Sequence, residues 1–492
     1  MRIIGNSGKP REVQAVASGT LPSGQPVVVN SDGTVSVVAE TSVSGAVGTA
    51  ATYESGATNW PSATFDSNTN KVFVAYEDDA SSDYGKCVVG TVNPSNNSIT
   101  FGSPVTFNNS ATTYTTCCFD TNANKVVLVY KDDSPGYHIA RVATISGTSV
   151  SLGSAVNIFT NVAYQLDCCF DSTNNKVFVC GRDNNGSGTG RELYGVVGTV
   201  SGTSISFGSF ATIGSAGQTP ADISCCYDSS NDRIVVAWRN VDDSGKGYAA
   251  VGQISGTDVS FGTAAIFVNN SLTSQSVDCA FDSNANKVVI VYADNGNLSK
   301  GTATVCDINT ANNAISFNTA VVFSTAAGAR PSVGFDSNTS KIVIAYSDFN
   351  NGWYGNVVTG TVGGTSITFD TPTVIHSSPT YYNSITFDSN SNKIVIALGT
   401  PFAGGISTVF QADYTSTNLT SENYIGISTG GAVADGGNAN VNIIGSVSDE
   451  QSGLTAGQQY YVQTDGTLSE TSADPSVLAG TAISAAKLIV KT

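Results

Sequence analysis

The chain has 492 residues, of which 40% are hydrophobic and 12% are charged, and its net charge is −17 at pH 7. Its 51 glycines, its single methionine and the absence of a long amphipathic pattern predict short strands joined by polar turns, that is, an all-β protein. The acidic balance argues against a nucleic-acid partner, and no apolar run is long enough for membrane insertion.

The N-terminal segment, residues 1–40, comes first. Residues 1–6 lack the apolar core of a secretion signal, so we expect synthesis in the cytoplasm. Residues 21–35 align without gaps to residues 454–468, and each stretch reads as a β-hairpin with Asp-Gly at its turn. We therefore expect residues 1–40 to pack with a C-terminal β module, residues 417–492, that serves attachment or oligomerisation.

A tandem repeat fills the chain between these ends. Its core is Phe or Tyr, then Asp, Ser or Thr, two variable residues, a turn residue, and Lys or Arg. It recurs seven times, about 54 residues apart, and each copy is followed by a run rich in Val and Ile. The copies begin at Phe65, Phe119, Phe170, Tyr227, Phe281, Phe335 and Phe387. A period in this range indicates an array or a closed ring.

Each repeat predicts four antiparallel strands, so residues 41–416 are expected to form a seven-bladed β-propeller. Repeat seven lacks its fourth strand, whereas residues 41–47 read like the fourth strand of repeat two, residues 148–156. We expect residues 41–53 to complete blade seven and close the ring, which removes exposed strand edges. An open solenoid is the structural alternative.

The ten cysteines are expected to pack as small hydrophobes. Most of them precede the repeat core, where other repeats carry Ala, Val, Gly, Ile or Thr. Neighbours on a strand face opposite ways, which disfavours a zinc site. Disulfide or metal pairing is the alternative.

Binding is expected on the face of the propeller whose loops vary from blade to blade, because binding residues sit disproportionately on loops carried by a rigid scaffold. The aromatic residues of that face are the candidate ligand-binding set, since amphipathic rings suit contacts to sugars or proteins. They are Trp60, Tyr114, Tyr164, Trp353, Tyr381 and Tyr382. For any one ring, covering the end of a blade is the alternative.

Acidic residues gather in the same loops, and calcium is the one cofactor they suggest, since it takes oxygen ligands. They are Glu77, Asp78, Asp79, Asp132, Asp133, Asp183, Asp242, Asp243, Asp294 and Asp348. No segment matches a calcium-loop pattern, so we expect solvated turns and no bound cofactor or metal. The Asp of each repeat core, Asp66 in the first, is expected to hydrogen-bond its own turn.

No catalytic residues are expected, and we expect no enzyme. The two histidines, His138 and His376, lie in different repeats without an evident Ser or Cys partner. The six arginines of the ring do not recur with the blades, as a sialidase-type arginine cluster would require. Paired carboxylates that meet by folding leave a glycan-degrading enzyme as a lesser alternative.

The repeat core, the link at residues 198–208 and the tail from residue 453 to Lys491 together resemble repeat proteins encoded by tailed phages of marine bacteria. The resemblance implies a virion structural protein, such as a tail fibre, a knob or a capsid decoration protein, assembled in the host cytoplasm. It implies other virion proteins as partners through the terminal module, and a host-surface glycan or protein as the target of the propeller. A cellular surface or secreted glycan-binding adhesin is the alternative.

Overall fold

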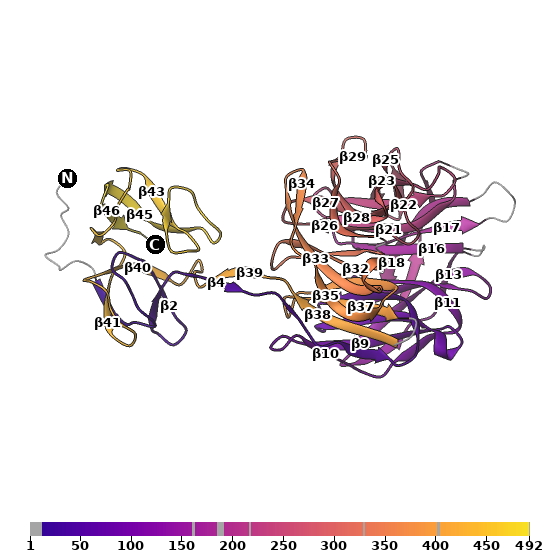
Figure 1. Cartoon of the computed structure of the whole chain (residues 1–492), viewed down its shortest axis with the longest axis horizontal. Helices are drawn as coiled ribbons and strands as arrows, with labels where there is room; N and C mark the ends of the chain where they lie inside the picture. The colour runs from indigo at the N-terminus through magenta and orange to yellow at the C-terminus, as the bar shows by residue number, and fades with distance from the viewer. Residues whose placement is uncertain are drawn as a thin grey trace. The chain divides into compact units, whose positions relative to one another are not determined.

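The structure is a computed structural model that describes residues 12–159, 163–184, 191–215, 218–327, 330–400 and 404–491. The first eleven residues of the expected N-terminal segment lie outside the described residues, as do parts of the expected loops at 159–166, 213–221 and 324–331. Contacts divide the chain into two compact units, residues 45–412 and the two ends that flank them. Figure 1 shows strands from both ends of the chain, indigo and yellow, within one unit.

The larger unit is the seven-bladed propeller, in which the strands of each blade pair antiparallel in chain order. Blades one to four contain β7 (Thr58–Asp66), β8 (Lys71–Asp78), β9 (Tyr84–Asn93), β10 (Ser98–Phe101), β11 (Val105–Asp120), β12 (Lys125–Asp132), β13 (Tyr137–Ser146), β14 (Ser149–Leu152), β15 (Val156–Phe159), β16 (Ala163–Asp171), β17 (Lys176–Asn184), β18 (Arg191–Ser201), β19 (Ser204–Phe207), β20 (Ala211–Ile213), β21 (Pro220–Asp228), β22 (Arg233–Asn240), β23 (Lys246–Ser255), β24 (Asp258–Phe261) and β25 (Ala265–Val268). Blades five to seven contain β26 (Asp278–Asp282), β27 (Lys287–Asp294), β28 (Lys300–Asn309), β29 (Ala314–Phe317), β30 (Val321–Ala327), β31 (Ser332–Asp336), β32 (Lys341–Asp348), β33 (Tyr354–Gly363), β34 (Ser366–Phe369), β35 (Thr373–Pro379), β36 (Tyr382–Asp388), β37 (Lys393–Thr400) and β38 (Gly404–Gln411).

The outermost strand of each blade differs from the single strand that the sequence predicts. It is divided into two short pieces that both pair with the third strand, as β19 and β20 do with β18. In five blades a glycine at the division packs against the hairpin turn of the next blade, and a Cβ on Gly153 would lie 1.9 Å from the carbonyl oxygen of Thr203. The strand therefore breaks where the neighbouring blade approaches its backbone.

The N-terminal strands close the ring. β5 (Ala46–Val47) and β6 (Ala51–Glu54) pair with β38 as the divided fourth strand of blade seven. The backbone N–H of Gly48 donates to the carbonyl of Val409 at 2.8 Å, and the same bond recurs in every other blade at 2.8–2.9 Å. The six equivalent donors are Gly102, Gly153, Gly208, Gly262, Asn318 and Asp370. The inner strand β36 also contacts β7, so the ring is continuous.

The repeat core shapes the blade, as predicted. Each of its seven aspartates accepts backbone N–H groups from the residues two and three positions later, as Asp66 does from Asn68 and Thr69 at 2.9 and 3.1 Å. The strand that follows is buried on both faces, and residues 72–76 of β8 have no exposed surface. All ten cysteines are free and nine of them are buried, which confirms the packing role.

Helical structure in the described ranges is limited to three short 3-10 turns, η1 (Asp79–Ser81), η2 (Asn295–Asn297) and η3 (Phe349–Asn351). Each follows the second strand of its blade and is capped by the last Asp of that strand, as Asp78 caps η1. Over the same ranges, no helix has the length and apolar character that crossing a bilayer requires.

The smaller unit contains two five-stranded sheets and a two-stranded antiparallel sheet of β4 (Glu40–Val43) with β39 (Tyr414–Thr417). Because this two-stranded sheet belongs to the smaller unit, the boundaries between the units fall at 44/45 and 412/413, four residues from each expected boundary. The first sheet contains β1 (Glu12–Val16), β2 (Pro26–Val29), β3 (Val35–Val37), β40 (Tyr424–Thr429) and β41 (Asn438–Asn442). The second contains β42 (Val447–Ser448), β43 (Gln459–Val462), β44 (Leu468–Ser469), β45 (Val477–Ser484) and β46 (Lys487–Val490). One shared hydrophobic cluster joins the two sheets.

The two sheets are copies of one topology, which extends the predicted hairpin similarity to five strands. Numbered along the chain, each sheet has the strand order 1-5-4-2-3. Each also has a β-bulge at the same place in its fourth strand, beside Gly426 in the first copy and beside Gly480 in the second. A Cβ on either glycine would lie about 2 Å from a carbonyl oxygen of the fifth strand. The propeller is thus an insertion between the third and fourth strands of the first copy.

Candidate functional site

The seven inner strands meet around a pocket of about 230 Å³ at the end where these strands begin. We call it the axial pocket. Its mouth is lined by the residue that each blade places five positions, in blade five six positions, before the Phe or Tyr of the repeat core. These residues are Trp60, Tyr114, Gln165, Asp222, Gln275, Arg330 and Tyr382. A repeated backbone position therefore carries a different side chain in nearly every blade.

A recurrent backbone distortion aims these side chains. Trp60, Tyr114, Asp222 and Gln275 have φ values of 49–60°, and Gln165 has a φ of 23°, a region that residues other than Gly rarely adopt. In the first four blades a β-bulge interrupts the pairing of the inner strand at this place. Bulges re-aim side chains and are frequent beside functional sites, and strained residues persist only where their surroundings hold them.

The floor of the pocket is a ring of short polar side chains, three positions before the Phe or Tyr in every blade. They are Ser62, Thr116, Asp167, Ser224, Asp278, Ser332 and Ser384. Several of these side chains accept a hydrogen bond from the next blade, where the donor is the backbone N–H of the residue directly after the floor residue. Asp278 accepts the N–H of Val333 at 2.8 Å, and Ser384 accepts the N–H of Ala63 at 2.9 Å. The floor thus ties neighbouring blades together around the axis.

Two carboxyl groups of this floor are half-buried. Asp278 accepts the hydroxyl of Ser224 at 2.7 Å and the N–H of Cys279 at 2.9 Å, yet burial raises its pKa to about 6. Burial also raises the pKa of Asp167, which accepts the hydroxyl of Thr116 at 2.7 Å. Both carboxyl groups are held by donors from their own and neighbouring blades, which is the environment of a structural acid.

Four of the six predicted binding residues line the axial pocket: Trp60, Tyr114, Tyr381 and Tyr382. The ring of Trp60 lies between those of Tyr114 and Tyr382, with centroids 4.5 and 4.6 Å away. The guanidinium of Arg330 lies 5.1 and 5.5 Å from the centroids of Tyr382 and Tyr381. These residues form a continuous aromatic wall on one side of the pocket.

The other two predicted residues lie outside the pocket lining. Trp353 packs against Phe349 and Tyr381, with centroids 3.5 and 4.8 Å away, so it supports the aromatic wall from behind. Tyr164 lies beneath the guanidinium of Arg182 and the ammonium of Lys131, at 4.5 and 4.9 Å. For both rings, the alternative of covering the end of a blade describes these contacts better.

The opposite wall of the pocket is polar. Asp222 accepts Nε–H of Arg239 at 2.6 Å, and its backbone N–H donates to Oε1 of Gln165 at 2.7 Å. Oε1 of Gln275 and Oδ1 of Asn383 are buried acceptors without a partner among the described residues. Gln165, Asp222, Gln275 and Arg330 are not among the predicted binding residues, because that prediction depends on aromatic side chains. Alignment of the seven repeats at this one position would have found them.

The described histidines and cysteines lie outside the lining of the axial pocket. His138 is fully buried, its Nδ1 contacts the hydroxyl of Tyr194, and burial lowers its pKa to about 3. Burial raises the pKa of the Cys87 thiol to about 12. The arrangement in the pocket suits the binding of a ligand that is apolar on one face and carries hydroxyl groups.

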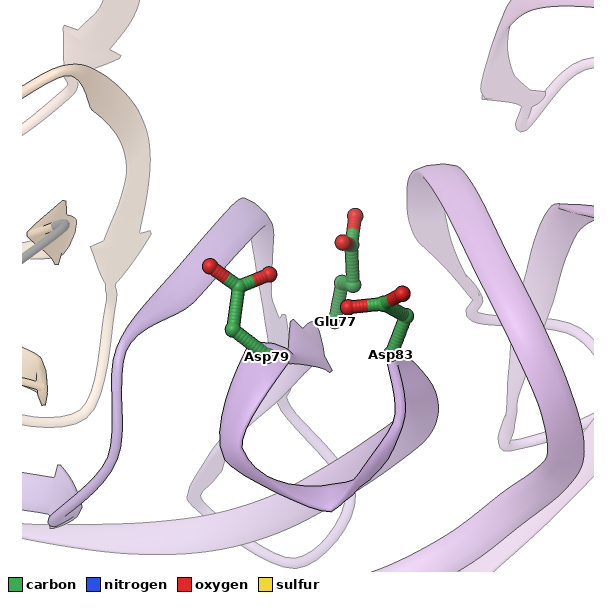
Figure 2. A group of neighbouring side chains, drawn as sticks. All are labelled: Glu77, Asp79 and Asp83. Carbon is green, nitrogen blue, oxygen red and sulfur yellow. The ribbon is translucent and has the colours of Figure 1, made fainter.

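The expected acidic loops separate into two kinds. Asp78, Asp294 and Asp348 cap their 3-10 turns, and Asp243 pairs with Lys246, as turn residues are expected to do. Glu77, Asp79 and Asp83 instead converge, with ligand oxygens within 4.8 Å of one another (Figure 2). Among the described residues, this is the group that could hold a metal ion.

The sequence matches no protein-family model and no curated protein. Solved structures similar to the chain include the NanB sialidase from Streptococcus pneumoniae, at 12% identity and a TM-score of 0.43 over 73% of this chain and 69% of that one. A protein of unknown function from Dyadobacter fermentans matches at 11% identity and a TM-score of 0.45, over 68% of this chain and 99% of that one. A leech intramolecular trans-sialidase matches at 10% identity and a TM-score of 0.44, over 73% and 68%. At such identities and scores the similarity carries no information on activity.

Proposed function

We propose that the propeller is a carbohydrate-binding module whose ligand enters the axial pocket. The observation that carries the proposal is the variation at the mouth of that pocket. One backbone position recurs in all seven blades there, but its side chain changes between blades although the repeat core does not. A position that only shaped the blade would be expected to recur, as Asp66 and its six equivalents do.

The chemistry of the two walls fits a sugar ring. A pyranose has a face of C–H groups that packs on aromatic rings, which Trp60 and Tyr382 supply, and an edge of hydroxyl groups that hydrogen-bond. Asp222, Gln275 and Arg330 offer acceptors and donors across the pocket. At about 230 Å³ the cavity is smaller than the roughly 300–1,000 Å³ of pockets for drug-sized ligands, so it suits one sugar residue at the end of a glycan.

The binding test is a glycan array probed with the wild-type protein, with Trp60→Ala and with Phe210→Ala. Phe210 is an aromatic residue with 48% of its surface exposed, and it lies outside the pocket lining, so it controls for the loss of a surface ring. We expect binding to a defined set of glycans by the wild type and by Phe210→Ala, and loss of binding by Trp60→Ala. Absence of binding to any glycan, or equal binding by all three proteins, contradicts the proposal.

We further propose that the protein is a virion appendage, with the propeller directed to the host surface and the smaller unit attached to other virion proteins. The support is the resemblance of the repeat core and of the tail to phage repeat proteins. Proteomic analysis of purified particles from the source culture tests this part. Detection of the chain in particles is expected, whereas its recovery only from cells or from the medium favours a cellular adhesin.

A further inference from the structure

We propose that Glu77, Asp79 and Asp83 form a binding site for a divalent cation of the calcium class, beside the mouth of the axial pocket. Glu77 is the next-to-last residue of β8, Asp79 begins η1, and Asp83 follows η1 in the loop to β9. Figure 2 shows Asp79 and Asp83 on either side of Glu77, with the three carboxyl groups on the same side of the ribbon. Glu77 pairs with Asn59, which precedes Trp60 in the pocket mouth.

Glu77 is buried, and one of its carboxylate oxygens has no partner among the described residues. Its side chain is 5% exposed, and its Oε2 atom is buried without a hydrogen-bond partner among the described residues. An unpaired buried carboxylate is costly, and such groups are normally paired or coordinate a metal. Burial is the main cause that raises the pKa of Glu77 to about 8, and the nearby Asp79 and Asp83 add to it. A cation bound by the three carboxyl groups would give the Oε2 atom of Glu77 the partner that it lacks.

The residues equivalent to Glu77 in other blades differ from it in their partners. At the position of Glu77, twelve residues after the Phe or Tyr of the repeat core, blades two, three and four carry Lys131, Arg182 and Arg239. Lys131 pairs with Asp133 at 2.6 Å, and Arg239 pairs with Asp222 at 2.6 Å. Lys131 and Arg239 therefore each have a counterion from their own blade, and Arg182 lies over the ring of Tyr164 and donates to the carbonyl of Pro220. No ion pair among the described residues involves Glu77, Asp79 or Asp83.

The nearest basic residue along the chain is already used. Lys86 pairs with Asp78, which points away from Glu77 because neighbours on a strand face opposite ways, and with Glu54 at 3.4 Å. Asn59 donates to Oδ1 of Asp79 at 2.8 Å and to Oε1 of Glu77 at 3.4 Å, and so positions these two carboxylates. Three carboxylates can supply up to six of the six to eight oxygen ligands that calcium takes.

The experiment measures calcium binding to the whole chain by isothermal titration calorimetry after removal of metal with a chelator. The variants are Glu77→Gln and Asp83→Asn, and the matched control is Asp348→Asn. Asp348 lies in the corresponding loop of blade six, where it caps η3, a role in which Asn is equally effective. We expect one site in the wild type and in the control, and about 10-fold or weaker binding in the two variants.

Thermal unfolding supplies a second measurement that separates metal binding from a structural role. Calcium is expected to raise the melting temperature of the wild type and of Asp348→Asn, but not that of Glu77→Gln. In chelator, Glu77→Gln is expected to be at least as stable as the wild type, because it removes like-charge repulsion. The proposal is overturned by absence of binding up to about 1 mM calcium, the weak end of protein calcium sites, or by equal binding in all four proteins.

Discussion

Replacement of Gly48 by Ala tests how the N-terminal strand closes the propeller. A Cβ at this position would lie 1.7 Å from the carbonyl oxygen of Asn97, whereas ordinary contact begins at 3.4 Å. The atom it meets is backbone, in the turn between β9 and β10, so no side-chain rotation relieves the clash. Either the N-terminal strand leaves β38 or the turn of blade one moves. Forcing an extra carbon into a packed contact costs about 1–3 kcal/mol, and occasionally more.

Urea unfolding of three variants gives the comparison. Gly153→Ala makes the same contact between blades two and three, with a Cβ 1.9 Å from the carbonyl oxygen of Thr203, and we expect a similar cost. Gly363→Ala is the control, because a Cβ there meets no atom within 4 Å and its backbone is not left-handed. We expect the control to be neutral or up to about 1 kcal/mol more stable. If Gly48→Ala were as stable as Gly363→Ala, the N-terminal strand would not hold the ring as described.

Two further predictions concern the floor of the axial pocket and the smaller unit. Burial raises the pKa of Asp278 from 3.8 to about 6, so the folded state binds its proton more tightly than the unfolded state, and stability is gained as the pH falls through this range. Relative to Asp278→Asn, the wild type should gain about 2 kcal/mol in urea unfolding between pH 7 and pH 4, and parallel pH profiles of the two proteins would contradict the burial of this charge. Val43 and Tyr414 pair directly in the two-stranded sheet of β4 and β39. Joining them through Asn-Gly, which favours a two-residue hairpin turn, should therefore leave the smaller unit folded without the propeller. Cooperative thermal unfolding with a β-type circular dichroism spectrum is expected, and an unfolded product would show that the two copies depend on the insertion.

The repeat makes the blades predictable because each element of the repeat core has a local physical role. The aspartate accepts hydrogen bonds from backbone N–H groups of the turn that follows it. The turn residue before the Lys or Arg has a left-handed backbone, as Asn70 does with a φ of 55°. The closure was also predictable, since residues 41–47 resemble a fourth strand that repeat seven lacks. Both inferences depend on similarity between the repeats, which the sequence shows directly.

The division of the outer strand, the five-stranded duplication and the charged groups of the site depend on contacts between distant residues. The sequence shows that Gly153 is small, but not that Thr203 approaches it. Aromatic content alone points to Trp60, Tyr114, Tyr381 and Tyr382, which line the axial pocket because large rings at the loop ends converge on the axis. It missed their polar partners across the pocket, and it could not separate Glu77, whose Oε2 is unpaired, from the capping aspartates of other blades.

The most direct test of the carbohydrate-binding proposal is a crystal structure of the protein with the oligosaccharide that binds best on the array. We predict electron density for a sugar ring in the axial pocket, packed on Trp60 and Tyr382 and hydrogen-bonded to Arg330, Gln275 or Asp222. Density for the sugar at any other surface, with the axial pocket filled only by water, would contradict the assignment.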